Sequence, residues 1–439
     1  MYKKIYLYFD ECYNKRNLGV IFMLQKPKGT IDLFGEKGKI FNNIEMYTHD
    51  FMKLNNFEYI KVPTFESSNL YKRGVGESTD IVNKETYDFI DKGGREMTLR
   101  PEFTAGIVRS YIENKEYSYN RLKKYYYFGS CFRYERPQSG RLREFTQFGV
   151  EVIGAKSARL DADIIYMAYK YLEGIGIKNL KVKINTLGDN ESRNKYKDIL
   201  KEYISKDYDN LCDLCKDRFD RNPLRILDCK YDGSRDYIKN APKTIEFLNE
   251  DSINYFNSVK DSLNELGIDY EVDTTLVRGL DYYTHTVFEI VSSDERLGLA
   301  STICGGGRYD NLVRMLDGPD TTAVGFAIGI ERIITALVSD EEFKIENDID
   351  IYVMNLTNDA FAYKLNNDLK SNGYISEVCY ENKNMKQQWK IVDELNPSFV
   401  VIIGEDEIAG GYVTIKDNKT KEQVSVKNDE IIDYFNTYY

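Results

Sequence analysis

The segment from Phe132 to Gly154 constrains the fold of this 439-residue chain more than any other. It predicts two strands joined by a long charged loop. A guanidinium can hold phosphate oxygens through two parallel hydrogen bonds, whereas a lysine offers only a point charge. All basic residues of the segment are arginines, namely Arg133, Arg136, Arg141 and Arg143. The segment therefore favours a sheet that forms the floor of a pocket for a polar, phosphorylated ligand.

The strand after the loop alternates between polar and apolar faces, because side chains along a strand alternate with period two. Phe145, Gln147 and Glu151 share one face. A solvated hairpin with ordinary surface charges is the alternative interpretation. Glu151 argues against it, because this carboxylate lies among valines where an unpaired charge is costly to bury. The opposite face is apolar and consists of Phe148, Val150 and Val152.

Composition indicates an ordinary globular protein of two or three domains, with 42% hydrophobic and 30% charged residues. The net charge of −11 argues against bulk nucleic-acid binding, although a local basic patch can still serve a specific partner. The chain contains no apolar run of about 18 residues, and its first residues lack the features of a secretory signal. We therefore expect a cytoplasmic protein without a membrane span.

The seven cysteines are scattered and odd in number, which fits a reducing compartment. Cys212 and Cys215 form a CxxC motif, and Cys229 follows in LDCK. Zinc would need a fourth ligand, and neither histidine lies nearby in the sequence. We interpret these cysteines as reduced structural thiols and assign no metal ligand, so that zinc binding is left open.

Histidines are scarce, and this limits the available chemistry. Only His49 and His285 occur, so an HExxH zinc site is excluded and a Ser-His-Asp triad would have to use one of the two. His49 lies in a helical pattern and is expected to be solvated. His285 is expected near the active site, where a neutral neighbour is as good an interpretation as a catalyst. The chemistry is therefore expected to rely on positioning and electrostatics.

The pattern along the chain predicts several domains. A strand is expected over 58–66, and residues 97–104 are expected to be extended, with Arg100, Glu102 and Thr104 on one face. Residues 190–266 are highly charged and predict a helical insertion between two strand-rich regions. An acidic linker at 340–348 precedes alternating strands and helices that close with a hairpin, which predicts an α/β domain with a largely parallel sheet.

The common nucleotide-binding loops are missing. There is no GxxxxGK[ST] motif, and CGGGRYD does not form GxGxxG, so both a P-loop and a Rossmann site are disfavoured. An ATP site would instead have to be built from arginines on a sheet. Arg278 precedes a glycine and two tyrosines, and Arg332 begins a helix whose N-terminus favours anions.

Taken together, these segments resemble the bacterial-type histidyl-tRNA synthetase family of class II aminoacyl-tRNA synthetases. The match runs from about Lys26 to near the C-terminus. The segment 132–154 resembles the second class II motif, AVGFAIGIERI the third, and EYIKVPTFE the first, which lies at the dimer interface of that class. RGLDYYTHTVFE and GGGRYD resemble the two signatures peculiar to histidyl enzymes.

The resemblance implies an α+β fold in which a class II antiparallel-sheet catalytic domain spans 23–340. This domain contains a helical insertion at about 190–266, and an α/β anticodon-binding domain follows at 348–439. Residues 1–22 form an extension outside the match. The implied activity is that of a histidine–tRNA ligase, which activates L-histidine with ATP and Mg²⁺ to histidyl-adenylate and transfers it to the 3′ end of tRNA(His). The implied assembly is a homodimer.

The resemblance also assigns roles by position. Arg278 and Arg133 are catalytic: Arg278 stabilises charge developing at the α-phosphate, and Arg133 holds that phosphate. Glu135 fixes the adenine, Phe145 stacks on it, and Arg332 holds the γ-phosphate. The histidine site comprises Glu102, Phe103, Thr104, Gln147, Glu151, Tyr282 and Tyr283. Contacts to the tRNA acceptor end fall to Arg136, Gln138 and Arg141.

Three positions depart from the family pattern. Phe103 stands where glycine is common, Thr146 where histidine is common, and His285 where glycine is common. By strand parity, Phe103 and Thr146 are expected to point away from the ligand face and to affect packing only, whereas His285 is expected to alter the rim of the pocket. A rival reading is the catalytically silent paralogue that regulates ATP phosphoribosyltransferase. That paralogue is expected to lack the anticodon domain and active-site residues, whereas this chain keeps the C-terminal region and Arg278.

Overall fold

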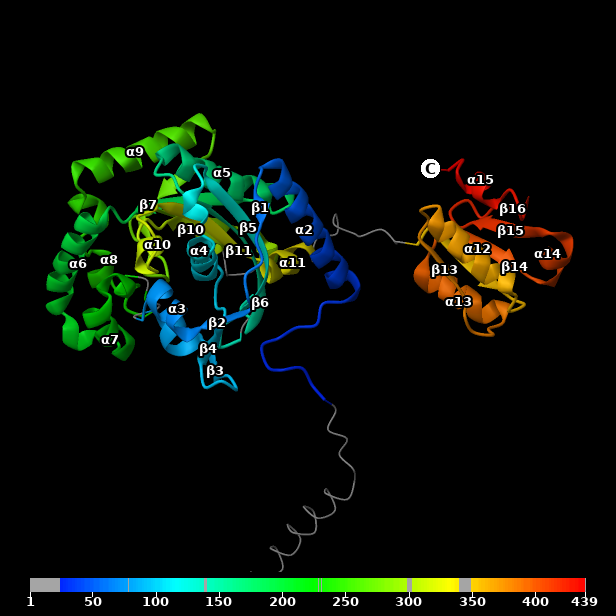
Figure 1. Cartoon of the computed structure of the whole chain (residues 1–439), viewed down its shortest axis with the longest axis horizontal. Coiled ribbons are helices and arrows are strands. Elements are labelled where there is room, and N and C mark those ends of the chain that lie inside the picture. Colours follow the sequence, from blue (N-terminus) through cyan, green and yellow to red (C-terminus); the bar gives the residue numbers. More distant parts are fainter. Residues whose placement is uncertain are drawn as a thin grey trace, which may run out of the picture. The chain divides into compact units, whose positions relative to one another are not determined.

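The computed structural model describes residues 24–77, 79–137, 140–227, 229, 231–297, 302–338 and 349–438. The chain divides into two compact units, Met1–Phe343 and Lys344–Tyr439 (Figure 1). The predicted extension at 1–22 and the predicted linker at 340–348 lie outside the described residues. None of the described helices is long and apolar enough to cross a membrane.

An eight-stranded sheet forms the centre of the first unit, in the order β1-β5-β6-β11-β10-β9-β7-β8. Its six middle strands pair with one another in antiparallel fashion, while the two edge strands pair in parallel, β1 with β5 and β8 with β7. The predicted antiparallel catalytic sheet is thus confirmed. The strands are β1 Glu58–Tyr59, β5 Lys123–Phe132, β6 Glu144–Ile153, β7 Leu180–Thr186, β8 Tyr270–Val272, β9 Thr284–Ser292, β10 Thr302–Arg308 and β11 Ala323–Gly329.

Strand β6 has the two faces that its alternation predicts. On the apolar face, the ring of Phe148 lies 4.4 Å from that of Tyr171 on helix α5 (Ala158–Gly174) and 5.7 Å from that of Phe326 on β11. Helix α11 (Ile330–Val338) also packs against β6, next to helix α2 (Gly35–Leu54) (Figure 1). The helices therefore cover the apolar face and leave the other to form the site.

The predicted strand over 58–66 is broken, because only Glu58 and Tyr59 join the large sheet. The chain then leaves it, and β2 (Phe65–Ser67) pairs with β4 (Glu96–Leu99) in a separate three-stranded sheet with β3 (Tyr87–Ile90). Pro63 lies at the break, where it has no N–H to offer a ladder. The carbonyls of Val62 and Pro63 instead accept hydrogen bonds from Arg100 Nη1, at 2.9 and 3.3 Å.

The predicted extended stretch over 97–104 also ends early. Strand β4 stops at Leu99, Phe103 has helical backbone angles, and helix α4 begins at Thr104 and runs to Glu113. Strand parity therefore does not place Phe103. Its ring is buried because it stacks on Tyr127, at 4.2 Å between centroids, with the Arg100 guanidinium 4.0 Å above it.

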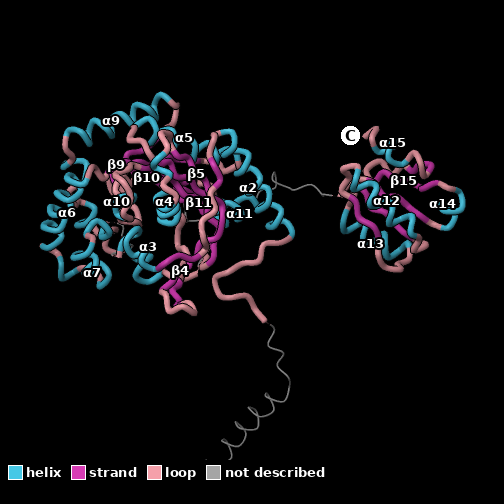
Figure 2. The backbone as a smooth tube through the Cα atoms, viewed as in Figure 1, coloured by secondary structure: helices cyan, strands magenta, loops and turns pink. Residues whose placement is uncertain are grey.

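The helical insertion is confirmed. It lies between β7 and β8, which pair with each other in parallel, so the insertion forms the crossover between these two strands. Its helices are α6 Asn190–Ser205, α7 Asp213–Arg221, α8 Asp236–Lys239 and α9 Glu250–Glu265. Most of the insertion packs around an apolar cluster of its own, and α9 lies along α5 (Figure 2).

A buried ion pair joins the sheet to its covering helices. Arg308 on β10 and Asp161 on α5 are both fully buried, and Arg308 Nε donates to both carboxylate oxygens at 3.0 and 3.1 Å. Asp161 also accepts hydrogen bonds from Thr286 on β9, at 2.7 Å, and from Tyr255 on α9, at 3.0 Å. Four elements therefore meet at one carboxylate.

His285 differs from its expected place at the pocket rim. It is buried beside Tyr255, with 5.0 Å between ring centroids, and it does not line the cavity described below. Its backbone has φ +43°, in the left-handed region that favours glycine. This explains why glycine suits the position. The other histidine, His49, is half-buried on α2 and pairs with the Tyr126 hydroxyl at 2.9 Å, so it is less solvated than expected.

The second unit is the predicted α/β domain. Its five-stranded sheet has the order β13-β12-β14-β15-β16, in which β13, β12 and β14 are parallel and β15 and β16 form the closing hairpin. Its elements are β12 Ile351–Asn355, α12 Ala360–Ser371, β13 Ser376–Val378, α13 Met385–Leu395, β14 Phe399–Ile403, α14 Glu405–Gly410, β15 Tyr412–Asp417, β16 Gln423–Lys427 and α15 Ile431–Phe435. Apolar clusters pack on both faces of this sheet.

Candidate active site

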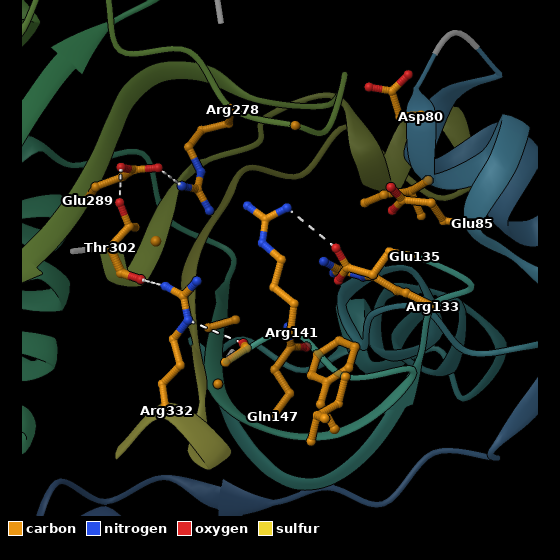
Figure 3. A pocket seen from close by; sticks show the side chains of 18 of the residues that line it. Asp80, Glu85, Arg133, Glu135, Arg141, Gln147, Arg278, Glu289, Thr302 and Arg332 are labelled. Carbon is orange, nitrogen blue, oxygen red and sulfur yellow. Dashed lines mark hydrogen bonds and ion pairs between the residues drawn. The ribbon is translucent and has the colours of Figure 1, made fainter. Parts of the chain in front are cut away.

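A cavity of about 710 Å³ opens over the polar face of the large sheet (Figure 3). Strands β6, β9, β10 and β11 contribute to its walls, together with the loop after β5 and helix α7 of the insertion. Its size is that of a cofactor or nucleotide site. Among the described residues, six guanidiniums line it, and they belong to Arg133, Arg141, Arg218, Arg225, Arg278 and Arg332.

Arg133 is positioned where β5 ends. Its backbone N–H donates to the Arg143 carbonyl at 2.9 Å and its Nε to the Pro101 carbonyl at 2.9 Å, so the stem is fixed at two points. The guanidinium carbon lies 5.2 Å from the centre of the Phe145 ring, on the neighbouring strand. A cation and an aromatic plane are thus held side by side on the cavity floor.

Arg332 and Arg141 approach the same space from other sides (Figure 3). Arg332 is in the first turn of α11, where its Nη1 donates to the Thr302 carbonyl and its Nε to the Gly140 carbonyl at 3.3 Å. Arg141 pairs with Glu135 at 3.4 Å. Burial and, secondarily, the nearby Arg141 lower the pKa of Arg332. An anion between these two cations would relieve their mutual repulsion.

Arg278 enters the cavity through a gap that glycine leaves. Gly305 lies on β10, and a Cβ at that position would overlap the Arg278 guanidinium. Arg278 Nη1 pairs with Glu289 of β9, and Glu289 accepts a second hydrogen bond from the Thr302 hydroxyl at 3.0 Å. Arg278 Nε is buried and finds no hydrogen-bond partner among the described residues. A buried unpaired donor is costly unless a ligand satisfies it.

Glu151 lies deeper on the same face of β6. Its carboxylate accepts hydrogen bonds from the Thr104 hydroxyl, at 2.6 Å, and from the Tyr309 hydroxyl. It fits because Gly325 stands opposite on β11, where a Cβ would overlap the carboxylate. Burial raises the pKa of Glu151 to about 8, against the opposing effect of these two hydrogen bonds. The ligand-free side chain is therefore mostly neutral near pH 7.

Two buried tyrosines lie close to this carboxyl and to Arg278. The rings of Tyr282 and Tyr283 are 4.8 Å apart between centroids. Burial raises the pKa of Tyr283, the charge of Arg278 opposes this rise, and Glu151 adds to it. Glu102 has a further contact, since its carboxylate accepts the backbone N–H groups of Thr104 and Ala105 at 2.6 and 2.9 Å. It thereby satisfies two free N–H groups in the first turn of α4. Glu151, Tyr283 and Arg278 therefore influence one another electrostatically within one site.

The structure brings most of the predicted site residues together. Arg133, Arg141, Arg278, Arg332, Glu135, Phe145 and Gln147 line the cavity. Glu102, Thr104, Glu151, Tyr282 and Tyr283 form the buried polar group behind it. Arg143 instead stacks over Tyr134 at 3.9 Å, and Arg136 is exposed. Gln138 lies outside the described residues. Thr146 faces α11, where its N–H donates to Glu331 at 2.7 Å.

Some cavity residues escaped the sequence interpretation. Glu289 interrupts an apolar strand as Glu151 does, and that same signal would have found it. Arg218 and Arg225 of the insertion reach Asp80, and their side chains are almost fully buried. No local pattern indicates this contact, because it joins segments more than a hundred residues apart in the chain.

Comparisons with known proteins agree with this geometry. Residues 29–333 match the family model described as histidyl-tRNA synthetase, and residues 350–438 match that of an anticodon binding domain. The chain is 44% identical over 418 residues to the histidine–tRNA ligase of Staphylococcus haemolyticus, covering 94% of this chain and 99% of the relative. The enzyme of that name from Bacillus subtilis is 44% identical over 411 residues, covering 92% and 97% of the two chains.

Solved structures are similar as well. The apo histidyl-tRNA synthetase of S. aureus superposes with a TM-score of 0.80 at 37% identity, covering 94% of this chain and all of that one. A Bacillus halodurans structure, titled as an ATP phosphoribosyltransferase regulatory subunit/histidyl-tRNA synthetase, has a TM-score of 0.59 at 22% identity over 87% and 98% of the two chains, which speaks to the fold alone.

The antiparallel sheet with its arginine-lined cavity is that of a class II aminoacyl-tRNA synthetase. Within that class, the chain belongs to the histidyl-tRNA synthetase family.

The raised pKa of Glu151 predicts how stability depends on pH. The carboxyl ionises near 4.5 in the unfolded chain and near 8 in the native state, so native stability is lost as pH rises through this window. Because Glu151→Gln cannot ionise, its free energy of unfolding should rise relative to that of the wild type over this pH range, by at most about 5 kcal/mol. Unfolding midpoints at about pH 5 and about pH 8.5 would measure the difference. Glu36→Gln, an exposed site, is the control, and an equal shift in both variants would contradict the assignment.

Proposed function

We propose that the chain is a histidine–tRNA ligase that activates L-histidine with ATP and transfers it to the 3′ end of tRNA(His). One observation carries the proposal. Three guanidiniums from separate elements, Arg133, Arg278 and Arg332, converge on one cavity that adjoins a buried carboxyl. Guanidiniums bind phosphoryl groups, and a buried carboxyl can bind an amino acid with a polar ring.

ATP would lie on the cavity floor. In this arrangement the adenine stacks on Phe145, with Glu135 at its polar edge, and Arg133 holds the α-phosphate beside it. Arg332 holds the γ-phosphate from the first turn of α11, where the helix N-terminus also favours negative charge. The loop residues Arg136, Gln138 and Arg141 would then meet the acceptor end of the tRNA.

Histidine would lie between Gln147 and the buried polar group. Glu151, Glu102 and Thr104 offer oxygen acceptors for the ammonium and the ring N–H groups, while Tyr282 and Tyr283 enclose the imidazole. An amino acid without a polar ring would leave these groups unpaired, at a cost that gives strong discrimination. Phe103, which is buried against Tyr127, would shape this site from behind.

Arg278 would act in the transition state. The carboxylate oxygen of histidine attacks the α-phosphorus, a new P–O bond forms, and pyrophosphate leaves with the electrons of the broken bond. Charge builds on the non-bridging oxygens, and a preorganised guanidinium stabilises it without reorganisation. Arg278 suits this role because Glu289 holds it in place and one of its buried donors is unused.

Mg²⁺ is expected to accompany the triphosphate. Glu289 fits such an ion, since each of its carboxylate oxygens has one hydrogen-bond partner and keeps capacity for a hard cation. When bound, Mg²⁺ would neutralise charge on the phosphates. Glu135, on the opposite wall, offers a second carboxylate.

The transfer step needs a proton acceptor for the terminal hydroxyl of the tRNA. No histidine is found among the described residues that line the cavity. A non-bridging phosphate oxygen of the adenylate would therefore take the proton, while the hydroxyl oxygen attacks the carbonyl carbon and AMP leaves. The second unit would bind the anticodon, and its match to anticodon binding domains supports this. The cytoplasm, where protein synthesis takes place, is the proposed location.

A homodimer is also proposed, through the face around β2 and β3. Phe65, Phe89 and Ile90 are 52%, 41% and 72% exposed there, and the centroids of the two phenylalanine rings are 6.0 Å apart. Clustered exposed apolar side chains of this kind mark interfaces.

Amino-acid-dependent pyrophosphate exchange tests the activity. We expect labelled pyrophosphate to enter ATP when L-histidine is supplied, and not with any other standard amino acid, because only histidine satisfies the buried polar groups. Exchange that did not depend on histidine, or no exchange at all, would refute the proposal. Charging of a tRNA(His) transcript then tests the second step.

Arg278→Ala should slow histidine-dependent exchange by about 100-fold or more, because it removes a transition-state contact. Gly305→Ala tests the same residue indirectly. The added methyl displaces the guanidinium, and a slowing of about 100-fold is expected while the fold is retained. Gly106→Ala on α4, whose new Cβ would meet Val62 at an ordinary 3.4 Å, serves as the control. Near-normal exchange in Arg278→Ala would exclude the role.

Ile90→Glu should convert the dimer to a monomer, because it places a charge in an apolar interface. Sedimentation velocity at micromolar protein measures the change. The matched control is Ile253→Glu, which alters an exposed isoleucine on α9 in the insertion. The proposed face would be wrong if Ile90→Glu remained dimeric, and a monomeric wild type would exclude the dimer itself.

A further inference from the structure

Four side chains of the helical insertion gather at one point, apart from the residues assigned to ATP or histidine. They are Cys212, Cys215, Cys229 and Asp232, and their potential ligand atoms all lie within 4.8 Å of one another. In the sequence they form two short pairs, C-x2-C and C-x2-D. Paired ligands two residues apart are typical of structural zinc sites. Asp232 supplies the fourth ligand that the sequence interpretation lacked.

The separation of the sulfur atoms fits a common metal ion. Cys212 Sγ and Cys229 Sγ are 3.8 Å apart. In a tetrahedral zinc site with Zn–S bonds of about 2.3 Å, two sulfur ligands stand roughly 3.8 Å from each other. A disulfide would require about 2.05 Å. The distance is thus that of two ligands on one ion.

Both ligand pairs lie on turns that aim them inward. Cys212 caps helix α7, and Cys215 follows in its first turn, with its N–H donating to the Cys212 carbonyl at 2.9 Å. In the second pair, the Asp232 N–H points at Cys229 Sγ, at 3.5 Å, and the Gly233 N–H donates to the Cys229 carbonyl at 2.8 Å. A Cβ on Gly233 would lie 2.6 Å from that carbonyl oxygen, so the turn requires glycine.

The surroundings also suit a bound cation. Cys215 and Cys229 are buried, so an ion between them would be shielded from water. Asp232 Oδ2 accepts the Cys212 N–H at 3.0 Å, and Arg235 Nη1 lies 3.5 Å from its Oδ1. Such outer contacts hold a ligating carboxylate in orientation and offset the negative charge of the thiolates.

We propose that Cys212, Cys215, Cys229 and Asp232 bind one Zn²⁺ ion in a closed, structural site. Each cysteine binds as a thiolate and releases its proton to solvent, and the carboxylate completes the tetrahedron. Soft thiolates select zinc over Mg²⁺ or Ca²⁺. Four protein ligands leave no open position, so the ion has no catalytic part.

The site would fix one wall of the cavity. Cys229 and the neighbouring Tyr231 line that wall, as does Arg218 of α7, which pairs with Asp80 across the insertion boundary. An ion that ties α7 to the Cys229 turn therefore holds these groups in place. The ligand geometry at this site is independent of the proposed activity.

Metal analysis of the full-length chain, expressed with added zinc, tests the proposal. We expect about one zinc per chain by inductively coupled plasma mass spectrometry, with loss of most of it in Cys215→Ser and in Asp232→Ala. Cys379→Ser is the matched control, since it removes a buried cysteine of the second unit and should keep the zinc. Removal of the metal should also lower the unfolding midpoint of the wild type.

Cobalt(II) substitution of the wild type covers the case in which the variants fail to fold. Tetrahedral cobalt with thiolate ligands gives strong visible absorption and a near-ultraviolet charge-transfer band, and both are expected here. Protein that holds no stoichiometric zinc and gives no such spectrum would overturn the proposal. So would thiol titration and peptide mapping that revealed a Cys212–Cys229 disulfide, or iron and sulfide in place of zinc.

Discussion

The ion pair between Arg308 and Asp161 is the interaction on which the catalytic unit depends. Both side chains are fully buried, so water solvates neither charge. Removing one partner should therefore lower the free energy of unfolding by about 3–5 kcal/mol. The pair fixes β10 against α5, and Asp161 also binds groups from β9 and α9. Strand β10 in turn carries Gly305, which leaves room for Arg278. The position of the cavity arginine therefore follows from a contact on the other side of the sheet.

The site combines buried charge with missing side chains. Gly325 leaves the space that Glu151 fills, as Gly305 does for Arg278, and in each case a methyl group would displace the functional group. Strand glycines usually weaken a sheet, because they add entropy to the unfolded chain and pack nothing. Here they admit groups that need a low dielectric to act strongly. The GGGRYD segment therefore serves close packing within a strand and not a phosphate-binding turn.

Local patterns predicted the parts of the fold that depend on neighbours in sequence. The alternation of β6, the helical insertion and the parallel-then-hairpin order of the second unit were all foreseeable from local patterns. The errors fell at 58–66 and 97–104, for two different reasons. At 58–66 a long-range contact prevails over local preference, because Arg100 donates to the carbonyls of Val62 and Pro63. At 97–104 the cause is local, because Glu102 accepts the first N–H groups of α4 and so favours a helix start there. Neither contact leaves a periodic trace.

Residue types and their spacing established which groups are available: an arginine-rich hairpin, a carboxylate among valines, and only two histidines. Family resemblance added their roles. Which of these groups meet depends on the folded chain, because convergence requires strands far apart in the chain to become neighbours. In the folded chain Arg278 pairs with Glu289, and His285 is buried beside Tyr255 with a positive φ. Asp232 lies beside the three cysteines. Distances between side chains are a property of packing, and composition and spacing do not contain them.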